Sequence, residues 1–149
     1  MADLRFRQVV TNVSCTGAAA QTLIQLKAPT NQRVVIREIG VSFAGTTNTD
    51  APALVRLMRQ TTAGTSSTGT PAVIDDDLTE TLQTVANITY TVEPTYGAVL
   101  ASWYVHQQTG IIVPLSTIRP IVIKGGGRVG LVVTAGATVS ASAYIEADE

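Results

Sequence analysis

The sequence of 149 residues has few of the residue types that most catalytic and metal sites require. It contains one cysteine, Cys15, and one histidine, His106. A single cysteine excludes an internal disulfide and any zinc site built on cysteine pairs, so we expect Cys15 to be a small buried thiol. A single histidine leaves one possible general base, and no nucleophile-elbow spacing lies near it. We therefore expect no catalytic residue and no cofactor, and the sequence predicts a protein that is not an enzyme.

Charge is also scarce. Charged residues make up 14% of the chain, against about 25% in a typical globular protein. The net charge is −1 and the ten basic residues are scattered, so no phosphate-binding stripe is expected. No apolar run reaches the roughly 20 residues of a membrane helix, and "MADLRFRQVV" has charges where a signal peptide has its apolar core. We expect a protein made in a cytoplasm, with neither nucleic acid nor membrane as partner.

The acidic run from Asp75 to Asp77 is a weak candidate for a cation site. Its carboxylates could bind a divalent ion. The run lacks the alternating ligand spacing and central glycine of a calcium loop, which favours solvated loop charges, and the sequence leaves this point open.

Glycine spacing in "IVIKGGGRVGLVV" matches a dinucleotide-binding fingerprint, because Gly125, Gly127 and Gly130 follow a predicted strand. That site needs a helix after the glycines, whose N-terminal N–H groups hold the pyrophosphate. The chain offers "LVVTAGATVSASAYIEADE" instead, which is β-branched and alternates with period two. The glycines therefore indicate the turn of a hairpin rather than a cofactor site.

What the sequence has in abundance is strand-like alternation. In "TVSASAYIEADE", Val139, Ala141 and Ile145 alternate with polar residues, which is typical of a half-buried strand. Turn clusters separate many such segments. The pattern predicts an all-β fold, an antiparallel jelly-roll-like β-sandwich. The predicted strands are 4–11, 21–27, 33–44, 53–61, 86–92, 98–107, 118–124, 128–134 and 138–146.

The domain organisation follows from length and composition. At this size we expect one β-sandwich domain over residues 13–149, preceded by an N-terminal arm or first strand over residues 1–12. Residues 61–70, rich in threonine and glycine, predict a mobile loop. "DLTETLQTVA" has the capping-box spacing from Asp77 to Glu80, which allows at most one short helix.

Aromatic residues are few, and Tyr96, Trp103 and Tyr104 lie close together in sequence. Trp103 shares the parity of Val105, so we expect it in the core. Tyr96 and Tyr104 would then face outward or lie in a loop, where each could anchor a protein contact. A platform for sugar stacking is the alternative.

From Glu93 onward the chain resembles small virion proteins of tailed bacteriophages. The residues that carry the resemblance are "EPTYGAVLASWYVHQQTG" (93–110) and "RPIVIKGGGRVGLVVTAGATVSASAYIEADE" (119–149). They form an E-P-T turn, a tryptophan strand, a glycine-rich hairpin and an alternating last strand with an acidic end. The resemblance is to capsid decoration, or cement, proteins.

This resemblance implies a jelly-roll or related fold, a place on the outer capsid surface of the virion and assembly commonly as a trimer. The implied partner is the major capsid protein, whose neighbouring subunits such a protein braces. It implies no catalytic residue.

The N-terminal residues predict a contact with that partner or with a neighbouring copy. "LRFRQVV" combines Arg5 and Arg7 with Phe6 near a chain end, where ordering usually needs a partner. We therefore expect residues 2–10 to form an arm. The predicted interface comprises Arg5, Phe6, Arg7, Tyr96 and Tyr104.

Three alternatives remain open from the sequence. One is another virion component of the same fold, such as a head-fibre base or a tail or baseplate protein. A second is a carbohydrate-binding module that uses Tyr96 and Tyr104. The third is an enzyme on a jelly-roll scaffold, which would depend on His106.

Overall fold

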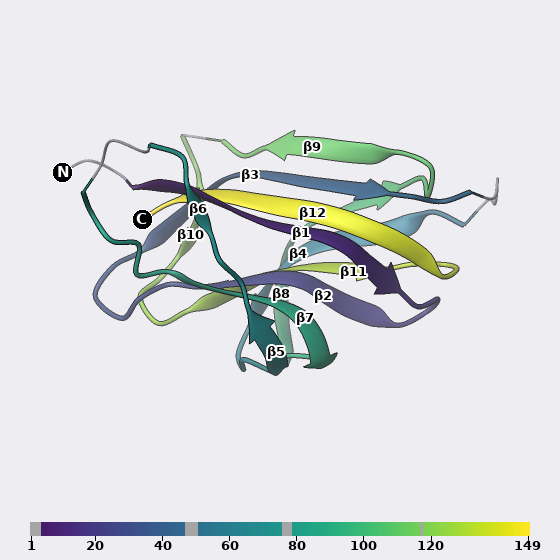
Figure 1. Cartoon of the computed structure of the whole chain (residues 1–149), viewed down its shortest axis with the longest axis horizontal. Coiled ribbons are helices and arrows are strands. Elements are labelled where there is room, and N and C mark those ends of the chain that lie inside the picture. Colours follow the sequence, from purple (N-terminus) through teal and green to yellow (C-terminus); the bar gives the residue numbers. More distant parts are fainter. Residues whose placement is uncertain (1–3, 47–50, 76–78, 117) are drawn as a thin grey trace.

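The structure is a computed structural model that describes residues 4–46, 51–75, 79–116 and 118–149. Within these ranges the chain forms twelve strands and no helix, and the strands build two antiparallel sheets packed face to face (Figure 1). None of the described residues forms a helix that could cross a membrane. The strands are β1 (Arg5–Cys15), β2 (Ala20–Lys27), β3 (Val34–Phe43), β4 (Ala53–Gln60), β5 (Thr65–Thr68), β6 (Ala72–Val73), β7 (Val85–Val92), β8 (Tyr96–Val105), β9 (Gly110–Pro114), β10 (Ile121–Ile123), β11 (Arg128–Thr134) and β12 (Val139–Asp148).

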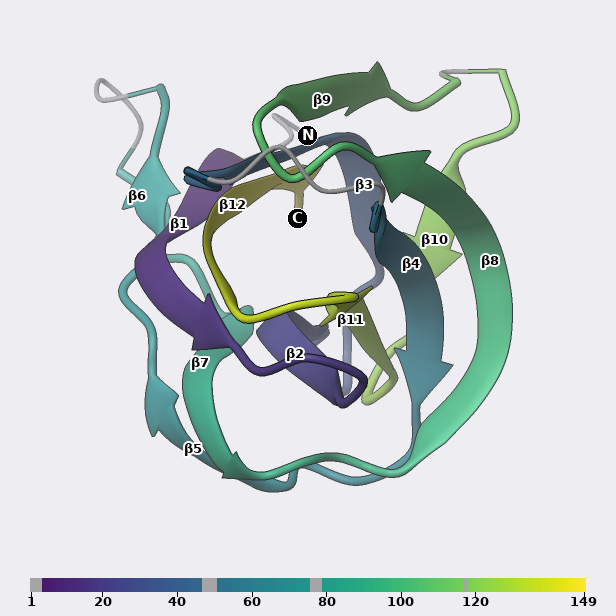
Figure 2. The same ribbon diagram turned by 90° about the vertical axis from the view of Figure 1, so that its right-hand side faces the viewer.

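The order of the strands confirms the predicted jelly-roll-like sandwich. The first sheet runs β10-β3-β12-β1-β6, with β9 also paired to β3, and the second runs β5-β7-β2-β11-β4-β8. From β1 to β4, and again from β10 to β12, the chain changes sheet at every strand. This alternation places β1-β12-β3-β10 opposite β2-β11-β4-β8, which is the arrangement of an eight-stranded jelly roll. Strands β5 to β7 are an insertion between β4 and β8 (Figure 2).

The core lies between the two sheets and follows the alternation of the sequence. On β12, Ala143 and Ile145 are buried while Ser142 and Tyr144 face away from the core. Phe6 on β1 and Leu131 on β11 are fully buried members of the same core. Side chains at every second position therefore hold the two layers together through apolar burial.

Each of the nine predicted strands is present, and three further strands extend the sheets. β5 lies inside residues 61–70, the predicted mobile loop, and pairs with β7 from Thr65 to Thr68. β6 is two residues long and pairs with β1. β9 pairs with β3 over five positions, from Glu38 opposite Pro114 to Ser42 opposite Gly110. The prediction of a loop is therefore wrong for Thr65–Thr68, because a partner strand satisfies its backbone groups.

The N-terminal residues form a strand inside the first sheet, not an arm. β1 lies between β12 and β6, and Arg5 pairs with Asp148 while Val10 pairs with Ala143. Leu4 and Glu149 also exchange two backbone hydrogen bonds of 3.0 Å. The interpretation as an arm is therefore wrong for residues 4–10, because ladder hydrogen bonds and the burial of Phe6 fix this segment in the sandwich; residues 2 and 3 lie outside the described ranges.

The segment with capping-box spacing is irregular rather than helical where it is described. Residues 79–84 form no helix, and Asp77 lies outside the described ranges. The Glu149 carboxylate accepts hydrogen bonds from the backbone N–H groups of Gln83, at 3.0 Å, and Thr84, at 2.6 Å. Leu82 packs against the core. Anchoring by Glu149 therefore replaces the hydrogen bonds of a helical turn.

The glycine-rich turn joins two sheets instead of forming a hairpin. β10 pairs with β3 in the first sheet, whereas β11 pairs with β2 and β4 in the second. Gly126 has a φ of 73°, in the left-handed region that glycine adopts at little cost. β11 follows directly, with no helix at residues 128–134, so the interpretation as a turn is confirmed while its description as a hairpin is corrected.

Candidate functional site: a trough on the outer face of the first sheet

A shallow apolar trough lies on the face of the first sheet that points away from the core. Four residues form one row across adjacent strands: Val9 pairs with Tyr144, Tyr144 with Gly40, and Gly40 with Ile112. Val9 and Ile112 stand at the two sides, exposed to 50% and 66%. The trough has a volume of about 510 Å³. We call it the outer trough; the residues that line it are Val9, Gly40, Val41, Ser42, Gly110, Ile111, Ile112, Ser142, Ala143 and Tyr144.

Small residues keep the trough open. Glycines at positions 40 and 110 and serines at positions 42 and 142 leave space between the larger residues that line it. A Cβ atom at Gly40 would overlap the ring of Tyr144. The ring therefore lies across the sheet because residue 40 has no side chain.

Tyr144 connects the trough to a group of charged side chains. Its hydroxyl donates a hydrogen bond of 2.5 Å to Oε1 of Glu38, and the Arg7 guanidinium carbon lies 4.5 Å from its ring centroid. Burial, followed by the nearby Glu38 carboxylate, raises the pKa of Tyr144 to about 12. The ring is thus held by a neutral hydroxyl donor on one side and a cation–π contact on the other.

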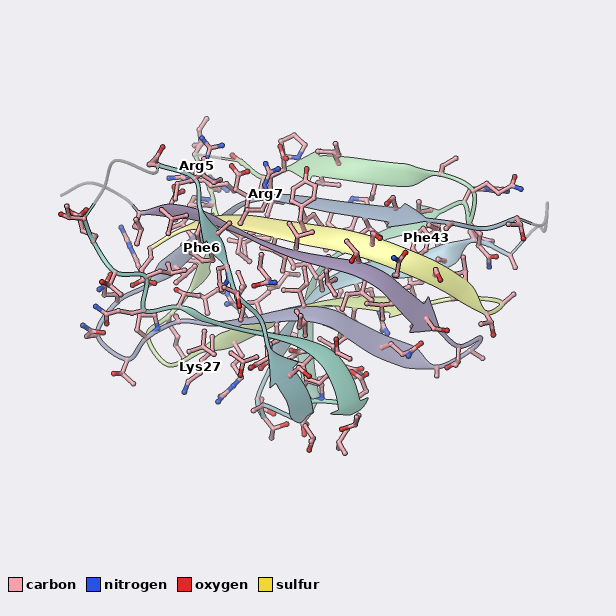
Figure 3. The ribbon with its side chains drawn as sticks, in the orientation of Figure 1. Arg5, Phe6, Arg7, Lys27 and Phe43 are labelled. Atoms are coloured by element: carbon pink, nitrogen blue, oxygen red, sulfur yellow. The ribbon has the colours of Figure 1, made fainter. Side chains whose placement is uncertain are left out.

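The charged cluster beside the trough consists of Arg5, Arg7, Arg37, Glu38, Glu146 and Asp148. Arg5 Nε donates to Oε1 of Glu146 at 2.7 Å, and Arg7 Nε donates to Oε2 at 3.0 Å. Arg37 forms an ion pair with Asp148. Figure 3 shows Arg5 and Arg7 close together on the N-terminal half of β1. Each carboxylate oxygen of Glu146 therefore has its own arginine.

The electrostatics of this cluster are set by Glu146. Its side chain is only 3% exposed. Burial alone would raise the pKa of Glu146, but hydrogen bonds from Arg7 and Arg5 outweigh it and hold the pKa below its usual value. Because three arginines face three carboxylates, the cluster has formal charges that cancel. It can orient a polar partner at the rim of the trough without a strong long-range field.

Predicted interface residues are divided between two sheets. Arg5 and Arg7 lie at the charged cluster, with side chains 51% and 41% exposed. Phe6 is fully buried in the core, so its expected contact with a partner is wrong: adjacent residues of a strand point to opposite faces. Tyr96 and Tyr104 lie near opposite ends of β8 in the second sheet.

The two tyrosines of β8 differ in their environment. The Tyr96 hydroxyl donates to Oε2 of Glu93 at 2.9 Å, and burial is the main cause that raises its pKa to about 12. Tyr104 is 74% exposed. They therefore form no common platform for a sugar ring, and Tyr104 alone remains available for an intermolecular contact.

Other segments of the same chain cover the outer side of the second sheet at its middle. Gln25 is fully buried and donates both to Gln60 Oε1, at 2.7 Å, and to the Thr62 carbonyl, at 3.0 Å. Gln60 in turn donates to the Thr22 hydroxyl at 3.0 Å. The segments that follow β4 and β7 pass across this side in Figure 2. The amide groups of Gln25 and Gln60 are therefore satisfied within the molecule.

The single histidine and the single cysteine of the sequence both have structural surroundings. The backbone N–H of Gln108 donates to Nδ1 of His106 at 3.2 Å in the turn after β8. Cys15 is buried, and this burial raises the pKa of its thiol to about 11, which disfavours the nucleophilic thiolate. Among the residues that the structure describes, no group of three His, Cys, Asp or Glu side chains could hold a metal ion. Asp76 and Asp77 lie outside those ranges.

The sequence does not predict the trough itself. It predicts a strand at Val9 but none at Ile112. Residues 110–114 do carry a strand pattern. Gly110, Ile112 and Pro114 are exposed, and they alternate with Ile111 and Val113, which pack against the core. Comparison with models of known families, curated proteins and solved structures gives no match to this chain.

Proposed function

We propose that this chain is a non-enzymatic virion structural protein, a decoration or cement protein of a tailed-bacteriophage capsid. It binds the outer capsid surface and stabilises contacts between major capsid subunits. The observation that carries the proposal is the outer trough, an exposed apolar surface on a sandwich whose strands fix its shape. The resemblance of residues 93–149 to cement proteins supplies the identity of the partner.

The chemistry of the trough favours a protein partner. Val9 and Ile112 offer apolar area on either side of a floor formed by the Tyr144 ring and small residues, and such a surface gains free energy by excluding water. Arg7 lies at its rim against the Tyr144 ring, and arginine is common in protein interfaces. A side-chain ridge of the capsid protein would fill the trough, and polar groups beside it would contact the charged cluster.

The overall charge suits dense binding on a repetitive surface. With a net charge of −1, neighbouring copies repel each other weakly. We propose a homo-oligomer, a trimer, in which several weak contacts act together and their combined avidity exceeds that of one subunit. Tyr104, exposed on β8, is the proposed contact between copies or with the shell.

Co-sedimentation tests this proposal. Shells are assembled from the major capsid protein encoded by the same genome and are mixed with increasing amounts of the purified chain. We expect saturable binding by the wild type and at least a tenfold weaker affinity for Ile112→Asp, because a carboxylate in an apolar contact is left without a partner. Ile118→Asp is the matched control, since Ile118 is 88% exposed and lies outside the trough.

Equal binding by Ile112→Asp and Ile118→Asp would exclude the trough as the contact. Failure of the wild-type chain to bind any shell would exclude the decoration function. The mass of the free oligomer, measured by light scattering in the same preparation, tests the trimer.

A further inference from the structure

A second, polar pocket lies where β1 passes the ends of β2 and β7. It has a volume of about 240 Å³ and shares no lining residue with the outer trough. Its lining residues are Thr11, Asn12, Val13, Ser14, Gln21, Thr22, Thr89, Tyr90 and Glu93. We call it the seam pocket, because it lies between a strand of the first sheet and two strands of the second.

Two strained residues line this pocket. Asn12 and Thr89 have φ values of 54° and 53°, in the left-handed region that non-glycine residues seldom adopt. For Thr89 the conformation is costly, since its side chain is β-branched. Both occur where a ladder is irregular: the register of β1 shifts between Val10 and Val13, and that of β5 against β7 shifts near Tyr90. Such bulges re-aim side chains and occur often beside functional sites.

The pocket also contains a polar atom without a partner. The Tyr90 hydroxyl oxygen is buried and has no hydrogen-bond partner among the described residues. Burial raises the pKa of Tyr90 to about 12, against a smaller lowering effect of Ser66, which pairs with Tyr90 across the ladder; no hydrogen bond of normal geometry joins the two side chains. A buried hydroxyl left unsatisfied costs free energy. Because this oxygen has almost no exposed surface, a ligand recovers that free energy only when the Tyr90 side chain turns its hydroxyl toward the pocket.

The other polar groups of the pocket are held in place. Glu93 Oε2 accepts hydrogen bonds from the backbone N–H of Thr22, at 2.8 Å, and from the Tyr96 hydroxyl, at 2.9 Å, which leaves Oε1 for a ligand. Gln21 is fixed at both ends, since its Oε1 accepts from Thr16 N at 2.6 Å and its Nε2 donates to the Ser14 carbonyl at 3.2 Å. Glu93 and Gln21 are thus held in place before a ligand binds, as groups of small-molecule sites usually are.

The residues that line the seam pocket indicate which class of ligand it can bind. Hydroxyl and amide groups dominate, and among the described lining residues Glu93 alone carries a charge. The pocket therefore has no cation to attract an anion. One carboxylate is also too few for a calcium site, which uses several acidic ligands. Its volume lies below the roughly 300 Å³ at which pockets for drug-sized ligands begin.

We propose that the seam pocket binds a neutral hydroxyl-rich ring, a single pyranose unit, through Glu93 Oε1, the Asn12 side chain and the Tyr90 hydroxyl, which a turn of the Tyr90 side chain brings to the pocket. Sugar hydroxyls both donate and accept, so one ring can satisfy an acceptor carboxylate, an amide and a phenol together. This function is separate from capsid binding, because it uses other residues. It also differs from the stacking platform expected at Tyr96 and Tyr104.

Titration of the ¹⁵N-labelled chain with glucose, galactose, mannose and N-acetylglucosamine tests the proposal by amide chemical shifts. We expect at least one sugar to shift amides at residues 12, 89 and 93. Asn12→Gly removes the amide but retains a residue suited to positive φ, and Tyr90→Phe removes only the hydroxyl. Each should weaken that sugar at least tenfold, while Tyr104→Ala leaves its affinity unchanged.

Three results would overturn this proposal: no sugar shifts these amides, Tyr104→Ala rather than Tyr90→Phe abolishes binding, or calcium chloride shifts the same amides and the sugars do not. The spectrum of each free variant shows whether it is folded. A disaccharide ending in the bound sugar then distinguishes a glycan terminus from the free monosaccharide, because only the former gains affinity from a second ring.

Discussion

At the scale of single residues, Glu146 makes the stability of the protein depend on pH. Its pKa is lowered in the folded protein by Arg7 and Arg5, which outweigh the opposing effect of burial. A carboxyl with a lowered pKa contributes stability above its unfolded pKa of about 4.3, and this contribution is lost as the pH falls through the lower folded value.

Replacement of this carboxylate therefore has a pH-dependent effect. We expect Glu146→Gln to lower the free energy of unfolding by about 1–2 kcal/mol at pH 7, through loss of hydrogen bonds between charged groups. The difference from the wild type should shrink as the pH falls below about 4. Urea denaturation at a series of pH values measures it, with exposed Glu80→Gln as the control. A difference that stays constant down to pH 3 would contradict this assignment.

Other residue-scale features show what sequence can and cannot predict. The parity of "LRFRQVV" already placed Arg5 and Arg7 on one side, but it could not show that Phe6 would enter a core, because the partner sheet is built from residues far along the chain. Gly40 is a further example. The Tyr144 ring packs over Gly40 only because β3 pairs with β12, and the sequence alone does not reveal this pairing.

At the scale of elements, β1 is required for folding rather than being an appendage. It lies between β12 and β6, and it carries the fully buried Phe6. Loss of a buried phenylalanine side chain alone costs about 3–5 kcal/mol, against a total stability of about 5–15 kcal/mol for a typical domain. Removal of the strand also exposes the unpaired edge of β12.

We expect a chain that lacks residues 2–10 to lose cooperative thermal unfolding and a dispersed NMR spectrum. The control is Val9→Thr, which keeps a β-branched residue at a half-exposed position and should remain folded. A truncated chain that unfolds cooperatively near the wild-type temperature would restore the interpretation of these residues as an arm.

The elements that sequence missed are those with weak signals of their own. Thr65–Thr68 is polar throughout and lies at a sheet edge, so it shows no apolar alternation. Ala72–Val73 is too short for any period. Gly110–Pro114 is bounded by residues typical of turns, and its pairing with β3 is decided by Ile111 and Val113 packing on the core. Long strands with one buried face were predicted because their own side chains carry the pattern.

At the scale of the whole molecule, the jelly roll brings four segments of the sequence into one surface. The outer trough is formed by residues 9, 40, 112 and 144, which meet only because β1, β12, β3 and β9 are adjacent. Neither composition nor local pattern could predict this surface, although the sequence did predict the fold that creates it. Because each side of the trough belongs to a paired strand, its shape is kept without a partner, which lowers the entropic cost of binding.

The proposed role is that of a brace, and the thermal rupture of capsid shells tests it most directly. Shells saturated with the wild-type chain are heated, and the release of an encapsulated dye reports their rupture temperature. If the chain stabilises the shell, the rupture temperature rises with occupancy. At the same total concentration, Ile112→Asp should give no rise, and Ile118→Asp should match the wild type. Full occupancy by the wild-type chain with an unchanged rupture temperature would contradict it.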